Sequence, residues 1–290
     1  ESVIYSTQQM SHGFAQLIKT VELTILNTEL TSTALSRLND ISGSIQGSQK
    51  SISSKDISSE ISDALVMRCC EPYGLSSEDP MTSSDLVDSS TFYNIHGTLI
   101  NIDTKGKVSP GIAKFWHVHE DQLTWEFHIR KGIRFHNGDV LTAEDVKFSY
   151  ERLLSKALNA NSAWILMDIE GAEEYHKGQA GSVSGIKVIN PHTLTIRLKT
   201  PYTGFLLNLG QPASSVISVR SFEKDRRITG CGPYRLTKNA SDEMLLEGFD
   251  DCYSGAPYIP KVKISLGDEN RVQRVINGEL DFVRIEDGQT

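Results

Sequence analysis

Two histidines two residues apart, His117 and His119, are the first pair in the sequence whose spacing could support chemistry. Because successive side chains of a β-strand point to opposite faces, both imidazoles would share one face of a strand. Imidazole nitrogens are common zinc ligands, so the pair could indicate a metal site. The sequence places no carboxylate or cysteine in a fixed position beside them. We therefore expect exposed histidines on a strand edge and no metal site.

The cysteines offer a second possible chemistry. The chain contains Cys69, Cys70, Cys231 and Cys252, without a CxxC motif or a Cys/His zinc pattern. Cys69 and Cys70 could form a strained disulfide, but adjacent strand residues point to opposite faces. We expect small free thiols, buried or half-buried, which favours a reducing compartment.

No motif that organises catalysis is visible in the sequence. It lacks G-x-S-x-G, a phosphate-binding P-loop and H-E-x-x-H. We therefore expect no catalytic residues, no cofactor and no enzymatic activity. The formal charge of -8 and a pI near 5.5 argue against a nucleic-acid partner, since such surfaces are normally basic.

The sequence contains no segment that predicts a transmembrane helix or a signal peptide. No run approaches the 18 or so consecutive apolar residues typical of a transmembrane helix. No charged start followed by an apolar stretch indicates a signal peptide. Because the sequence begins with Glu1 rather than Met, we expect it to be a piece of a longer protein.

The elements that would position any site are clearest between residues 123 and 154. Apolar Leu123, Trp125, Phe127 and Ile129 alternate with polar residues, which predicts a strand with one buried face. The Asn-Gly pair at 137–138 predicts a tight turn, because asparagine and glycine tolerate positive φ.

A helix should follow that turn. Thr142 and Asp145 have the spacing of a capping box, in which two side chains satisfy backbone groups at a helix start. Apolar residues then recur at helical spacing from Val146 to Leu154.

This stretch resembles the family 5 extracellular solute-binding proteins, the peptide- and nickel-binding receptors of ABC importers. The resemblance rests on a run that reads W-x-F-x-[LI]-R-x-G-[VI]-x-F-H-[DN]-G-x-x-[LF]-[TN]-A-x-D-V-x-[FY]-S in the family. The matching residues are Trp125, Phe127, Arg130, Gly132, Phe135, His136, Gly138, Thr142, Ala143, Asp145, Val146 and Ser149. The resemblance implies that these residues, His136 included, are structural.

Two further segments resemble elements of the family but differ from them at single positions. Residues 230–236 resemble the family's G-T-G-P-[YF] element, with Cys231 in place of the threonine. Cys231 could be a reactive thiol near a cleft, but we favour an isosteric replacement. Ile95 and His96 stand where family members commonly have Tyr-Glu, at a position expected on the surface of a helix.

The resemblance covers about residues 65–287 and implies an α/β fold, a type II periplasmic-binding-protein-like lobe. An inserted subdomain would span about residues 105–200 within a domain at 64–287. Family members are about twice as long and hold ligand between two lobes. We therefore expect an incomplete fold in which the second lobe is absent.

Residues 1–63 differ in composition from the rest of the chain. Apolar residues such as Met10, Phe14, Leu17 and Val21 repeat with a period near 3.5, as in a coiled-coil seam. We expect a long N-terminal helix with helix-mediated self-association. The segment weakly resembles the cytoplasmic signalling helices of chemoreceptors, and a helical or flexible linker is the alternative.

The resemblance also places a ligand-binding loop after the first strand, which we predict at 64–67. The loop residues are Glu71, Pro72, Tyr73 and Gly74. Tyr73 could stack on a ligand or bond to its backbone, and Glu71 could meet an ammonium group. The alternative is that the loop only connects the strand to the next helix, which we favour for Pro72.

The expected function is a non-catalytic binding module for a small solute, with oligopeptide as the leading ligand class and nickel chelates or sugars behind it. The alternative is a signalling, chemoreceptor-type protein that uses the same fold as a sensor. Expected partners are a small peptide or other solute and an ABC transporter permease or a signalling partner. The resemblance implies a periplasmic or extracellular, membrane-associated location, with the cytoplasm as the alternative.

Overall fold

A computed structural model describes residues 65–83, 86–103, 105–267 and 270–283. The predicted N-terminal helix and coiled coil at 1–63 lie outside the described residues. Within them, no helix has the length and apolar character needed to cross a membrane.

The first sheet brings the beginning and the end of the described chain together. It has five strands in the order β11–β1–β10–β9–β8. Their bounds are β1 Val66–Glu71, β8 Tyr234–Asn239, β9 Glu243–Gly248, β10 Lys261–Leu266 and β11 Phe282–Val283. Strand β1 pairs in parallel with both β10 and β11, whereas β10, β9 and β8 are antiparallel.

A second sheet of four strands has the order β4–β5–β7–β6 and is antiparallel throughout. Its strands are β4 Ala113–Val118, β5 Thr124–Ile129, β6 Ile186–Asn190 and β7 Thr193–Arg197. The short strands β2 Ile100–Ile102 and β3 Val108–Pro110 pair separately.

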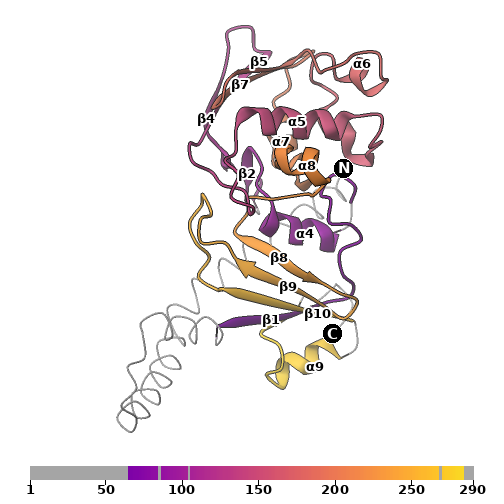
Figure 1. Ribbon diagram of the computed structural model, residues 1–290, viewed down its shortest axis with the longest axis vertical. Coiled ribbons are helices and arrows are strands. Elements are labelled where there is room, and N and C mark those ends of the chain that lie inside the picture. The colour runs from indigo at the N-terminus through magenta and orange to yellow at the C-terminus, as the bar shows by residue number, and fades with distance from the viewer. Residues whose placement is uncertain (1–64, 84–85, 104, 268–269, 284–290) are drawn as a thin grey trace.

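Helices fill the space between the two larger sheets. Figure 1 shows α4 between them, with α5, α7 and α8 on the side of the four-stranded sheet and α9 beyond β1. The α-helices are α4 Leu86–Ile95, α5 Ala143–Leu154, α6 Ala172–His176, α7 Phe205–Leu209, α8 Val219–Asp225 and α9 Arg271–Ile276. Two 3-10 turns, Asn161–Leu166 and Pro212–Ser214, complete the helical segments of the described residues.

The alternating pattern at 123–129 forms β5 as predicted. Trp125, Phe127 and Ile129 are buried in the larger hydrophobic core, and Glu126 and His128 point to the other face. Each apolar side chain removed from water in this way contributes roughly 1.5–3 kcal/mol. The core therefore fixes which face of β5 is turned outward.

Helix α5 packs on that core and begins at the predicted capping box. The backbone N–H of Thr142 donates to the Asp145 carboxylate at 2.8 Å, and the other oxygen of Asp145 accepts from the N–H of Val219 at 3.0 Å. One buried carboxylate thus fixes the start of α5 and joins it to α8.

The first strand lies later in the chain than predicted. We expected a strand at 64–67 and a ligand-binding loop that includes Glu71, but β1 runs from Val66 to Glu71. Met67 and Cys69 share one buried face, and pairing with β10 continues through Glu71 opposite Leu266. The prediction was wrong because Arg68 and Glu71, although charged, continue a ladder that the local apolar pattern does not reveal.

Candidate functional site

The carboxyl edge of the parallel strands is the first place to look for a ligand. Strands β1, β10 and β11 run in the same direction, so their carboxyl ends meet at one edge of the sheet. Ligands of open α/β sheets bind outside the carboxyl ends of the strands. The loop that follows Glu71 starts at this edge.

Glu71 is the last residue of β1 and not a loop residue. Its side chain is buried, and its backbone oxygen accepts a hydrogen bond from the N–H of Gly267 at 3.0 Å. A carboxylate in this position could meet a ligand only at the strand end itself. The predicted loop position of Glu71 is therefore corrected to that of a buried acidic group behind the loop.

The next three residues differ in what they present to solvent. Pro72 is half-buried, and Gly74 packs so closely over Leu266 that an added Cβ would lie 2.9 Å from that residue's Cδ1 atom. Tyr73 is the exposed member of the set, with 49% of its surface open to solvent. Of the four predicted residues, Tyr73 is the one with the most exposed side chain.

The loop is held to the helices behind it by two acidic side chains. Asp88, fully buried in α4, accepts from the backbone N–H of Ser76 at 3.1 Å and from the hydroxyls of Ser76 and Ser83. Asp79 pairs with Arg152 of α5. These contacts give the loop a fixed shape, which lowers the entropy lost on binding.

A surface pocket of about 270 Å³ lies between Glu78 of the same loop, the end of α4 and strand β8. None of the four predicted residues lines it. Its walls are formed by Glu78, Ile95, His96, His136, Asn137, residues 227–230 and residues 235–237. No sequence pattern pointed directly to this pocket, although His136 and Gly230 belong to the two blocks that carry the resemblance.

The two histidines of the pocket are neutral structural groups. Burial lowers the pKa of His96 to about 3, with a smaller effect of nearby His136, and burial lowers the pKa of His136 to about 4. His136 Nε2 donates to the carbonyl oxygen of Gly232 at 3.0 Å, and its backbone N–H donates to that of Gly230 at 2.9 Å. The predicted structural role of His136 agrees with these contacts.

The expected surface position of Ile95 and His96 was wrong. His96 is only 6% exposed, because the backbone around Gly230 packs directly against it. A Cβ at Gly230 would lie 2.1 Å from the backbone oxygen of Ile95. The departure from the family's Tyr-Glu pair therefore falls at a tightly packed joint between α4 and the segment before β8.

All four cysteines are buried and none forms a disulfide. Cys231 has no solvent exposure, and burial raises the pKa of its thiol well above the usual value. A nucleophilic cysteine needs a thiolate, so this environment disfavours the reactive-thiol alternative. It agrees with a small residue that replaces threonine in a packed turn.

His117 and His119 lie on the exposed face of the four-stranded sheet, as predicted. The premise that no carboxylate is fixed beside them was wrong, because Glu126 of β5 pairs with His117 across the two strands. Sequence spacing could not reveal this pair, since it depends on the register between β4 and β5.

Comparison with known proteins identifies the scaffold. The model of the bacterial extracellular solute-binding proteins, family 5 (Middle), matches residues 107–289. The chain is 26% identical over 270 residues to the probable ABC transporter periplasmic-binding protein SapA of Escherichia coli, covering 86% of this chain and 49% of that protein. It is 28% identical over 216 residues to the dipeptide-binding protein DppE of Bacillus subtilis, covering 70% and 40%.

A solved structure agrees with this assignment. The periplasmic oligopeptide-binding protein of Borrelia burgdorferi superposes with a TM-score of 0.70 at 25% identity, over 76% of this chain and 47% of that one. The chain spans about half the length of the curated relatives it matches. The α/β lobe predicted from the signature is thus confirmed as part of an oligopeptide-receptor-like fold, and the chain belongs to the family 5 bacterial extracellular solute-binding proteins.

Proposed function

We propose that the protein is a binding module for a small solute, with oligopeptide as the leading ligand class. Family membership supports this most directly, and matched relatives bear the names dipeptide-binding and oligopeptide-binding protein. The arrangement of the carboxyl edge supports it further, because a fixed loop presents Tyr73 where sheets of this kind take ligands.

The module acts by binding alone in this proposal. The four buried thiols and the two neutral pocket histidines serve packing, and the family consists of solute-binding proteins. Its place would be periplasmic or extracellular, next to the permease of an ABC importer. The sensing alternative rests on residues 1–63, outside the described residues, and no structural observation favours it. The predicted domain limits, 64–287 with a subdomain at about 105–200, are part of the same proposal.

Native mass spectrometry of the protein purified from its own cells tests the ligand class. We expect adducts whose masses and fragmentation identify short peptides, and we expect added peptides to replace them. Adducts of sugars or metal chelates that peptides do not displace would contradict the peptide assignment.

Tyr73 provides the test of the site. We expect Tyr73→Ala to weaken peptide binding by about 1 kcal/mol or more, roughly fivefold in Kd, because it removes the exposed ring of the loop. Isothermal titration calorimetry measures the change. Tyr258→Ala is the matched control, since Tyr258 is 64% exposed and lies outside the loop. Equal affinity of the Tyr73 variant and the control would remove Tyr73 from the site.

The substitution Glu71→Gln tests whether the charge of this side chain, rather than its size, contributes to peptide affinity. Glu71→Gln keeps the size of the buried side chain and removes its negative charge. If Glu71 holds a ligand's ammonium group, affinity for a peptide with a free amino terminus falls, while affinity for the N-acetylated peptide stays the same. An equal loss for both peptides would show that Glu71 acts only through the local structure.

A further inference from the structure

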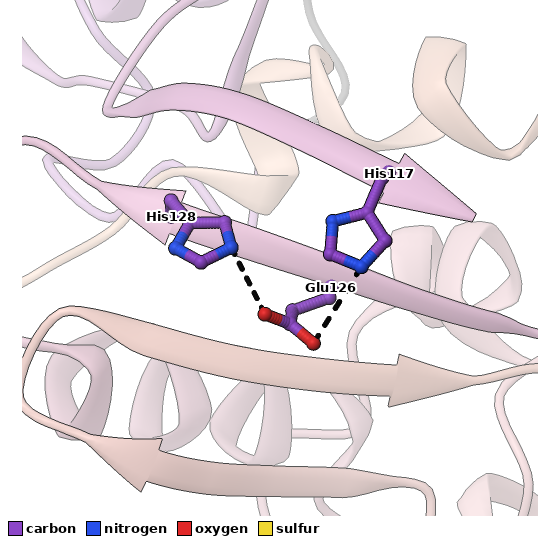
Figure 2. Close-up of side chains that lie close together, drawn as sticks. All are labelled: His117, Glu126 and His128. Carbon is purple, nitrogen blue, oxygen red and sulfur yellow. Dashed lines mark ion pairs between the residues drawn. The ribbon is translucent and has the colours of Figure 1, made fainter. Parts of the chain in front are cut away.

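The outward face of the four-stranded sheet carries a cluster of three imidazoles and one carboxylate, His117, His119, Glu126 and His128. Figure 2 shows His117 of β4 and His128 of β5 directed toward the carboxylate of Glu126 between them. The distances to the carboxylate oxygens are 3.7 Å from His117 Nε2, 3.1 Å from His119 Nε2 and 2.9 Å from His128 Nε2.

The strand register produces this convergence. His117 lies directly opposite Glu126, and Phe115 lies opposite His128. Residues two apart on a strand share a face, so His117, Glu126 and His128 project from the same side of two adjacent strands, and His119 follows directly after the end of β4. The cluster therefore stands on a hydrogen-bonded ladder rather than on a loop.

The rings are also held by stacking. His128 stacks on Phe115 with ring centroids 4.2 Å apart, and His117 stacks on His119 at 5.1 Å with planes only 3° from parallel. Such contacts restrict the rotation of the imidazoles, which reduces the entropy lost when a ligand fixes them.

We propose that His117, Glu126 and His128 form a binding site for a divalent transition-metal cation of the zinc class. One donor atom from each lies within 4.8 Å of the others. Donors bound to one zinc ion at 2.0–2.1 Å in tetrahedral geometry are ~3.3 Å apart. The present distances from the two imidazoles to the carboxylate, 3.7 Å to one oxygen and 2.9 Å to the other, lie on either side of that value. Because the donor atoms are up to 4.8 Å apart, a metal ion would have to draw the three side chains closer together.

Charge and donor chemistry select the cation. A donor set of two imidazole nitrogens and one carboxylate favours Zn²⁺, Co²⁺, Ni²⁺ or Cu²⁺ over Ca²⁺ and Mg²⁺, which prefer oxygen ligands. Strand β7 places uncharged Thr195 opposite Glu126 and Thr193 opposite His128. On the same strand, Arg197 is engaged by Asp121 and Glu170.

His119 acts as a positioning residue in this proposal. Its Nε2 lies 3.1 Å from the Glu126 oxygen that faces His117, and its ring backs the ring of His117. The side chains of His117 and His128 are 51% and 30% exposed, which leaves the site open to solvent and its remaining coordination positions to water. This site lies on a different sheet from the loop proposed to hold peptide, so the two proposals stand independently.

To test the proposal, Zn²⁺ alone is titrated into the tag-free, metal-free protein and binding is measured by isothermal titration calorimetry. Co²⁺ serves as a second probe because its visible absorption reports imidazole ligation and coordination number. We expect one equivalent to bind, a thermal midpoint that rises with Zn²⁺, and no response to Mg²⁺.

Four variants locate the site. His117→Gln, Glu126→Gln and His128→Gln should each weaken Zn²⁺ binding by about tenfold or more, since even outer-shell changes cost 10–100-fold. His119→Gln should weaken it less and leave the Co²⁺ spectrum unchanged in shape. His192→Gln, a histidine at the turn between β6 and β7, is the control and should bind as the parent does.

Two results would overturn the proposal: no binding of Zn²⁺ by the parent chain, or binding that the Glu126 and His128 variants retain. The four side chains are on the sheet surface, so the variants should fold. Equal thermal midpoints without metal verify this, and a variant that fails that check is replaced by the corresponding Asn substitution.

Discussion

The environment of a single side chain could be predicted at some positions of this protein and not at others. His96 was expected on a helix surface and is buried, whereas His136 was expected to be structural and lies within hydrogen-bonding distance of a backbone carbonyl. His136 was predictable because it stands inside a signature that implies a packed turn. His96 was not, because the backbone that covers it comes from Gly230, far along the chain.

The buried histidines predict a pH dependence of stability. Both pKa values are lowered in the folded state, to about 3 for His96 and about 4 for His136. Below about pH 6.5 the unfolded chain therefore binds protons that the folded chain does not, so the stabilisation present above pH 6.5 is lost as pH falls toward 4. Each unit of pKa difference corresponds to about 1.4 kcal/mol.

Urea unfolding at pH 7 and pH 5 measures this loss. We expect the free energy of unfolding to differ less between pH 7 and pH 5 in His96→Gln and His136→Gln than in the parent, because glutamine does not titrate. Burial raises the pKa of Asp145, which acts in the opposite sense but is common to all variants. His192→Gln is the control. If the free energy of unfolding differs between the two pH values by as much in both pocket variants as in the parent, the lowered pKa values are contradicted.

Among the elements, α5 shows how one short motif fixes a helix in the fold. The Thr-x-x-Asp spacing at 142–145 predicted the helix start, and the structure confirms α5 at Ala143–Leu154. The sequence did not reveal that the second oxygen of Asp145 would accept from Val219. Local spacing is sufficient for the cap, whereas the link to α8 depends on how the chain returns.

We expect Asp145→Ala to destabilise the protein by about 2–4 kcal/mol. The substitution removes the cap of α5, which contributes about 1 kcal/mol, and leaves the N–H of Val219 without its acceptor, which costs about 1–3 kcal/mol. Urea denaturation followed by circular dichroism gives the change. Glu144→Ala is the matched control, because Glu144 is exposed on the same turn. A loss no larger than that of the control would show that the carboxylate does not join the two helices.

At the scale of the whole molecule, two hydrophobic cores meet at a joint of close backbone contacts. The larger core lies under the four-stranded sheet and the smaller one under the five-stranded sheet. Gly230 and Gly232 pass against the end of α4, where a Cβ on Gly232 would lie 2.6 Å from the backbone oxygen of Asn94. Because rigid backbone lines both contacts, glycine is required there for steric reasons.

We expect Gly230→Ala to lower the free energy of unfolding by about 1–3 kcal/mol or more, as overpacking does. Its Cβ would meet the backbone of Ile95 at 2.1 Å, so α4 or the segment before β8 must shift. Gly181→Ala is the matched control, since a Cβ added there would have no atom within 4 Å and the φ of Gly181 is not positive. Chemical denaturation compares the two, and equal stability would show that the joint can relax.

The sequence by itself determined the local elements and the family scaffold. Alternation at 123–129 specified a strand, the capping box specified a helix, and the run from Trp125 to Ser149 carried the resemblance, because these signals depend on residues close in the chain. Only the tertiary structure decided that Glu71 ends a buried strand, that His96 is covered and that Glu126 stands beside His117. Those three outcomes depend on strand register and on contacts between distant segments, which side-chain periodicity cannot encode.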